Sequence, residues 1–136
     1  MPEQTAKKII LAVDDMPVNL AIIRNILCTD YDLRPLKSAK TALRLMDTLR
    51  PDLIILDVEM PEMSGLEFFN LIRSNPSHPE QKDIPVIFVS SHEVETIVAG
   101  AGNGGIQDYL VKPVDPATLL QKINSLLNTE RTSSRD

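Results

Sequence analysis

Residues 53–57 read Leu53-Ile54-Ile55-Leu56-Asp57, which is four consecutive apolar residues followed by one carboxylate. An apolar run without alternation is typical of a strand covered on both faces, in the middle of a parallel sheet. We therefore expect a central strand that carries Asp57 to its carboxyl end. A turn is predicted next, and Ser64 and Glu67 then have the spacing of a helix capping box.

A short apolar run followed by a helical pattern recurs along the whole chain. Strands are predicted at residues 8–13, 31–36, 53–56, 85–89 and 107–111. Pro17 suits the first turn of the first helix, Ser38 caps the second, and Asp115 caps the last. Five such units predict an α/β fold, a doubly wound parallel sheet with helices on both faces. The helix after the fourth strand is weak, because residues 100–105 contain four glycines.

Length and composition indicate one domain. The chain has 136 residues, and we expect residues 8–128 to form the domain and residues 129–136 to be a polar, unstructured tail or linker. A net charge of −5 without a basic cluster argues against direct nucleic-acid binding. No apolar stretch approaches the roughly 20 residues of a membrane span, and the N-terminus lacks a signal-peptide pattern, so we expect a cytoplasmic location. Cys28 is expected to be a buried thiol without a role.

Four of the predicted strands end on polar or charged residues. The carboxyl ends of parallel strands meet at one sheet edge, where ligands bind in open α/β sheets. Each residue alone has an ordinary explanation, as a helix cap, a turn residue or a solvated charge. Their conjunction at one edge is what indicates a site. The strand ends carry Asp14 and Asp15, Asp57, Ser90 and Ser91, and Lys112 with Pro113.

Three crowded carboxylates repel one another and so favour a bound cation. Oxygen ligands without His or Cys select a hard ion, and Mg²⁺ is the one that accompanies phosphoryl groups. Asp57 is then a candidate nucleophile that forms an aspartyl phosphate. Ser90 would donate a hydrogen bond to the phosphoryl group, and Lys112 would neutralise its charge.

This ordered set resembles the receiver domain of bacterial response regulators in two-component signalling. The resemblance covers about residues 8–128 and rests on Asp14-Asp15, on Asp57 with the Met60-Pro61-x-Met63-x-Gly65 pattern, on Ser90 and on Lys112-Pro113. It implies a flavodoxin-like (βα)5 fold with strand order 2-1-3-4-5. It also implies that Asp57 accepts a phosphoryl group from a histidine kinase or a histidine phosphotransfer protein, and that the domain is not an enzyme in its own right.

The resemblance also assigns roles to single residues. Asp15, Asp57 and the backbone carbonyl of Glu59 would ligate Mg²⁺ directly, with Asp14 acting largely through water. Ser90 and Lys112 would contact the phosphoryl group, and the Lys112-Pro113 bond would be cis. The resemblance implies three further roles: Tyr109 as the aromatic switch, and Glu59 and His92 as residues that tune the lifetime of the phosphorylated state.

Phosphorylation would then switch the surface formed by the fourth helix, the fifth strand and the last helix, which would meet an effector domain or a second copy of the chain. The glycine-rich residues 100–105 differ from the usual fourth helix of the family.

Three other interpretations share part of the pattern. A Mg²⁺-dependent phosphohydrolase of the haloacid-dehalogenase type also forms an aspartyl phosphate, but it places an Asp-x-Asp nucleophile on the first strand and adds a cap domain. A flavodoxin-like flavin binder would have a hydroxyl-rich loop where Asp14 and Asp15 stand. A non-phosphorylated interaction module would be expected to lack Asp57, Lys112 or one of the paired acids, and none is lacking.

Overall fold

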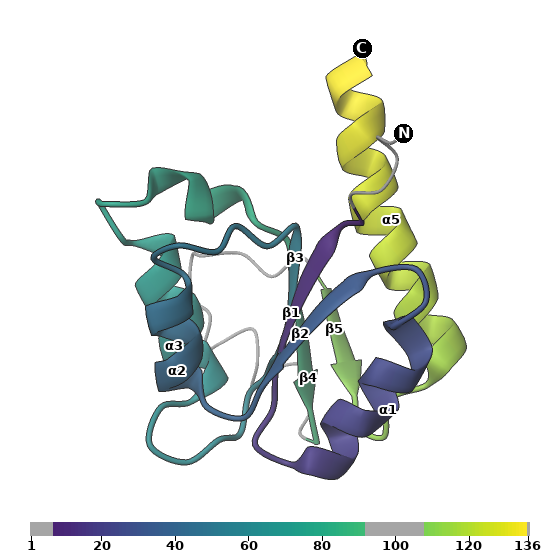
Figure 1. Ribbon diagram of the computed structural model, residues 1–136, viewed down its shortest axis with the longest axis horizontal. Coiled ribbons are helices and arrows are strands. Elements are labelled where there is room, and N and C mark those ends of the chain that lie inside the picture. Colours follow the sequence, from purple (N-terminus) through teal and green to yellow (C-terminus); the bar gives the residue numbers. More distant parts are fainter. Residues whose placement is uncertain (1–6, 92–107, 136) are drawn as a thin grey trace.

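The computed structural model describes the backbone of residues 7–91 and 108–135 and the side chains of residues 7–91 and 109–127. Within these residues, five parallel strands form one sheet in the order β2-β1-β3-β4-β5 (Figure 1). This confirms the predicted strand order, with β3 in the centre. The strands are β1 (Ile9–Val13), β2 (Asp32–Leu36), β3 (Leu53–Asp57), β4 (Val86–Ser90) and β5 (Asp108–Val111).

Helices cover both faces of the sheet. Helices α1 (Pro17–Leu27) and α5 (Pro116–Arg135) lie on one face, and α2 (Ala39–Leu45) and α3 (Gly65–Arg73) lie on the other (Figure 1). A short 3₁₀ helix, η2 (Pro79–Asp83), precedes β4. The doubly wound α/β fold is therefore confirmed.

Successive strand residues face opposite cores, because side chains alternate across a strand. Ile54 and Leu56 of β3 pack with Phe68 and Phe69 of α3. Leu53 and Ile55 belong to the second core, whose helical members come from α1 and α5: Leu20, Ile23, Leu27, Leu119, Ile123 and Leu127. All five residues of β3 are buried, as the unbroken apolar run predicts.

The predicted helix starts are confirmed. The Ser64 hydroxyl accepts the Glu67 backbone N–H at 3.1 Å, and the Glu67 carboxylate accepts the Ser64 N–H at 2.9 Å, which completes the capping box. The Ser38 hydroxyl accepts the Thr41 N–H at the start of α2. Asp115 accepts the Thr118 N–H at 2.9 Å at the start of α5.

Two expectations from the sequence are wrong. Residues 129–135 are not an unstructured tail, because α5 continues to Arg135. Cys28 is exposed, because it follows the last buried position of α1, Leu27, at the end of the helix. The weak helix expected before the glycines and the rate-tuning residue His92 lie outside the described residues.

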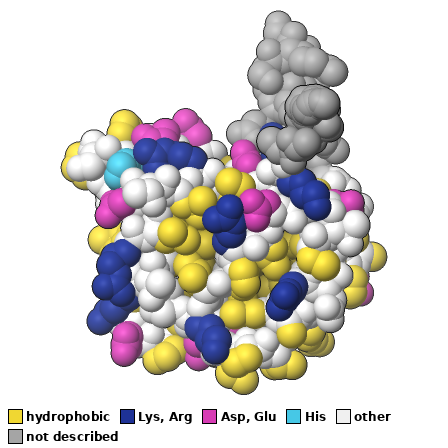
Figure 2. All heavy atoms as spheres, in the orientation of Figure 1, with side chains coloured by type: hydrophobic (Ala, Val, Ile, Leu, Met, Phe, Trp, Pro, Cys, Tyr) yellow, Lys and Arg dark blue, Asp and Glu magenta, His cyan; other side chains and the backbone are white. Residues whose placement is uncertain are grey.

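Charged side chains are dispersed on the face shown in Figure 2, where Lys and Arg are interspersed with Asp, Glu and hydrophobic groups. This face includes the edge strand β2, in which Arg34 pairs with Asp32 at 2.9 Å. The face therefore shows no basic patch of the kind that binds nucleic acid. Among the described helices, none combines the length and apolar character that crossing a membrane requires.

Candidate functional site

The end of β1 supplies two carboxylates. Asp14 is 2% exposed, and its Oδ1 accepts the backbone N–H of Met16 at 2.9 Å and the Asn19 side-chain amide at 3.4 Å. Met16, and not an aspartate, occupies the N-cap position of α1. Asp14 is therefore fixed by the turn that leads into α1, and Asp15 next to it is half-buried.

Asp57 lies at the end of β3 and is 1% exposed. Its Oδ1 lies 3.1 Å from Lys112 Nζ and accepts the Glu59 backbone N–H at 3.2 Å. Its Oδ2 is buried and has no hydrogen-bond partner among the described residues. One side of this carboxylate is therefore held while the other faces into the site.

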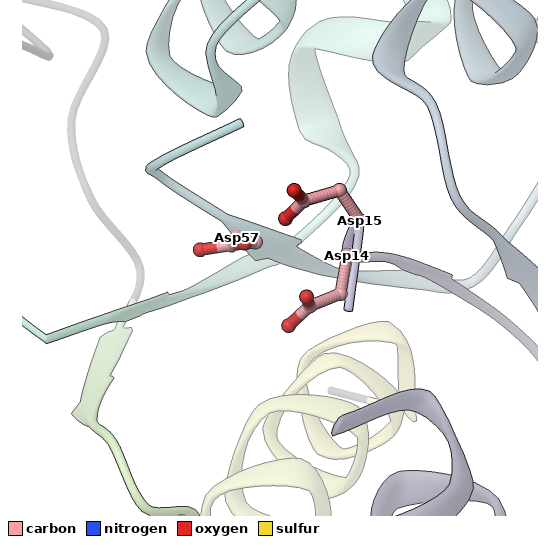
Figure 3. A group of neighbouring side chains, drawn as sticks. All are labelled: Asp14, Asp15 and Asp57. Atoms are coloured by element: carbon pink, nitrogen blue, oxygen red, sulfur yellow. The ribbon is translucent and has the colours of Figure 1, made fainter. Parts of the chain in front are cut away.

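The three aspartates converge at one edge of the sheet. Figure 3 shows Asp14 and Asp15, which directly follow β1, beside Asp57 at the end of β3. One oxygen from each of the three lies within 4.8 Å of the others. The sequence-predicted acidic cluster is thus brought together by the pairing of β1 with β3.

The environment changes the acidity of this group. Burial, followed by the negative charge of Asp14, raises the pKa of Asp57 from 3.8 to about 7, although Lys112 and the Glu59 N–H act in the opposite direction. Burial alone would lower the pKa of Lys112, but its hydrogen bond to Asp57 and the charges of Asp57, Asp14 and Glu59 raise it. Without a cation, the site therefore carries excess negative charge around one ammonium group.

Strands β4 and β5 complete the edge. Ser90 is fully buried at the end of β4 and donates its hydroxyl to Glu59 Oε2 at 2.5 Å. The Ser90 carbonyl accepts the Lys112 N–H at 2.8 Å, which ties the end of β4 to the residue that carries the ammonium group. The Lys112-Pro113 bond is cis, as predicted. Tyr109 on β5 is 37% exposed, and Lys122 of α5 lies 5.7 Å from its ring centroid.

The loop after β3 packs closely on the site. The Gly65 N–H donates to the Val58 carbonyl at 3.0 Å, and a Cβ on Gly65 would lie 2.1 Å from the Asp57 carbonyl oxygen. Glu62, in the same loop, has a φ of 69°, which few residues with a side chain adopt. The glycine is therefore required where α3 begins against the end of β3.

Sequence reasoning missed two contributors to the site. Asn19, in the first turn of α1, donates its side-chain amide to Asp14, and an amide side chain five residues after Asp14 was the available signal in the sequence. The Glu59 side chain binds Ser90, although only its backbone carbonyl and a rate-tuning role were expected. Ser91 also contacts Glu59, through its N–H at 3.4 Å.

Comparison with known proteins agrees with this geometry. A family model described as the response regulator receiver domain matches residues 10–124. The chain belongs to this family. The receiver assignment excludes the haloacid-dehalogenase and flavin-binding interpretations, and it supports a phosphoacceptor role in place of steady catalysis.

Similar proteins include larger signalling proteins and isolated receivers. A probable cyclic di-GMP phosphodiesterase of Vibrio cholerae is 35% identical over 96% of this chain, which spans only 29% of that relative's length. The Vibrio cholerae chemotaxis protein CheY4 is 28% identical, with a TM-score of 0.81 over 90% of this chain and 100% of that one.

A third similar protein was solved with a metal. The receiver of the sensor histidine kinase PA1611 from Pseudomonas aeruginosa is 25% identical, with a TM-score of 0.80 over 90% of this receiver and 99% of that chain. Its structure has a magnesium ion coordinated in the active-site cleft. Receivers therefore occur both alone and within kinases.

Proposed function

We propose that Asp57 accepts a phosphoryl group from the phosphohistidine of a histidine kinase or a histidine phosphotransfer protein. The observation that supports this most directly is the Asp57 carboxylate, which is held on one side by Lys112 while its buried Oδ2 has no partner among the described residues. Attack by a carboxylate oxygen on phosphorus forms a P–O bond, the P–N bond breaks, and its electron pair returns to the imidazole.

The residues present fit a magnesium ion. Three carboxylate oxygens lie within 4.8 Å of one another, and the cluster contains no His or Cys, so it suits a hard cation. Asp14, Asp15, Asp57 and the backbone carbonyl of Glu59 would hold the ion. When bound, Mg²⁺ supplies positive charge that offsets the charge on the phosphoryl oxygens.

The remaining residues position the phosphoryl group. Lys112 lies 3.1 Å from Asp57 Oδ1 and 3.7 Å from Asp14 Oδ2, so its ammonium can neutralise a phosphoryl oxygen on Asp57. Ser90, at the end of β4, can donate its hydroxyl to a second phosphoryl oxygen. Because the carboxylate itself is the nucleophile, the reaction needs its ionised form, which the positive charge of Lys112 favours.

The structural effect of phosphorylation is expected at β5, which lies on the other side of β4 from Asp14 and Asp15. Recruitment of Ser90 and inward movement of Tyr109 would change the surface that includes β5 and α5, which we propose meets an effector domain or a second copy of the chain. In this proposal, residues 8–128 are the phosphoacceptor unit of a cytoplasmic signalling protein, and residues 129–136 are a polar tail or linker. Glu59 and His92 set the lifetime of the phosphorylated state.

Intact-mass measurement with acetyl phosphate and Mg²⁺ tests this function. We expect one phosphoryl group per wild-type chain and none on Asp57→Asn. Asp30→Asn, which removes an exposed carboxylate, is the matched control and should be phosphorylated like the wild type. Full phosphorylation of Asp57→Asn, or no phosphorylation of the wild type, would contradict the proposal and favour a non-phosphorylated interaction module.

A further inference from the structure

The side chain of Glu59 binds the end of β4. Its carboxylate accepts the Ser90 hydroxyl at 2.5 Å, the Ser91 N–H at 3.4 Å and the Ser91 hydroxyl at 3.5 Å. The first of these is the short, charge-assisted contact, and the others are at the outer limit of hydrogen bonding. The Ser90 hydroxyl, which the proposed function assigns to the phosphoryl group on Asp57, is thus bound to another carboxylate.

The backbone fixes this contact. Val58 donates its N–H to the Val89 carbonyl at 3.0 Å and accepts the Gly65 N–H at 3.0 Å, while Glu59 donates its N–H to Asp57 Oδ1. The start of the loop is therefore attached to β4, to α3 and to Asp57 itself. A side chain at position 59 is carried toward Ser90 by backbone bonds that do not depend on its identity.

We propose that Glu59 is a latch that competes with the phosphoryl group for the Ser90 hydroxyl, so that residue 59 opposes activation of the receiver. A serine hydroxyl has a single proton to donate, so it cannot serve Glu59 and a phosphoryl oxygen at once. The charge of Glu59 also reaches Lys112, whose pKa it helps to raise, so it acts where phosphoryl charge would accumulate. Release of Ser90 is then part of the free-energy cost of phosphorylation.

The latch is separate from the metal site. The described carboxylates close enough to share an ion are those of Asp14, Asp15 and Asp57, and the Glu59 side chain is not among them. Its backbone carbonyl is the proposed ligand, so a change of side chain leaves that ligand in place. The Glu59 side chain thereby affects the phosphoryl group on Asp57 through Ser90, and not through the metal ligands.

The inference rests on the proposed phosphorylation of Asp57, and the affinity for beryllofluoride in the presence of Mg²⁺ tests it. We expect Glu59→Ala to bind beryllofluoride roughly tenfold more tightly than the wild type, the size of one charged hydrogen bond that no longer has to be broken. This gain should disappear in the Ser90→Ala background. Glu59→Gln keeps an oxygen that can accept the hydroxyl, so its gain should be smaller than that of Glu59→Ala.

A charge-matched control comes from the same loop. Glu62 is exposed and pairs with Lys40 at 3.7 Å, so Glu62→Gln removes one negative charge without touching Ser90. Its affinity for beryllofluoride should equal that of the wild type. If Glu59→Ala gains no affinity, or if its gain persists undiminished in Ser90→Ala, competition for the hydroxyl is refuted.

A second measurement separates failure of the latch from failure of the proposed function. Thermal unfolding of the metal-free wild type, Glu59→Ala, Ser90→Ala and the double variant forms a cycle that needs no phosphorylation. Non-additive losses support the contact, and additive losses overturn it. If the wild type does not bind beryllofluoride at all, the proposed function fails, and this cycle alone decides whether Glu59 holds Ser90.

Discussion

Replacing Asp57 by Asn should stabilise the metal-free protein at alkaline pH. The pKa of Asp57 is raised from 3.8 to about 7, mainly by burial and by Asp14, so the folded state disfavours the ionised carboxylate. Because each pKa unit corresponds to about 1.4 kcal/mol, ionisation of Asp57 costs the folded state roughly 4 kcal/mol at pH 8. Asn resembles the neutral carboxyl in shape. We therefore expect the free energy of unfolding of Asp57→Asn to exceed that of the wild type by about 2 to 4 kcal/mol.

The pH dependence has a definite sign. The folded state holds the Asp57 proton up to about pH 7, whereas the unfolded chain releases it near 3.8, so folding takes up a proton between these values. The contribution of Asp57 to the free energy of unfolding thus decreases as pH rises through this window and is constant above it. Wild type and Asp57→Asn should converge as the pH falls toward 4. Other groups titrate in both proteins and cancel in the difference.

Thermal unfolding in EDTA from pH 4.5 to pH 8 is the assay. At roughly 4 °C for each kcal/mol in a domain of this length, the two melting temperatures should differ by about 10 °C at pH 8. Asp30→Asn, an exposed substitution, should follow the wild type. Added Mg²⁺ should stabilise the wild type more than Asp57→Asn. Equal melting temperatures at pH 8, or a difference that does not change with pH, would refute the argument from burial and repulsion.

Three single contacts lead to further expected outcomes. Lys112→Ala should raise the pKa of Asp57 above about 7, because the ammonium at 3.1 Å is removed, and carbon NMR of the carboxyl would measure it. Gly65→Ala should lower the free energy of unfolding by more than about 2 kcal/mol, since its Cβ would lie 2.1 Å from a backbone oxygen; a melting temperature like the wild type's would contradict this. Ser64→Ala removes the capping box of α3 and should cost about 1 kcal/mol by denaturant titration, with no loss expected for a change at the exposed Ser77.

The central strand and the acidic cluster were predictable because they depend on pattern alone. Four apolar residues before Asp57 require a strand buried on both faces, and parallel pairing then brings Asp14, Asp15 and Asp57 to one edge. The length of α5 was not predictable in this way. Its apolar periodicity ends at Leu127, but a packed helix can extend over polar residues without a new nucleation step, and α5 runs to Arg135.

The Glu59–Ser90 contact shows where sequence reasoning stops. Adjacent strand ends can be inferred from topology, whereas the direction of a side chain in a loop depends on the backbone of that loop. Here the loop is set by the Val58 bonds to β4 and α3, by a positive φ at Glu62 and by the close approach of Gly65 to Asp57. None of these leaves a periodic signal. The same bonds hold Asp57 in place and direct Glu59 toward Ser90, so the loop that presents the phosphoacceptor also presents the group that opposes its activation.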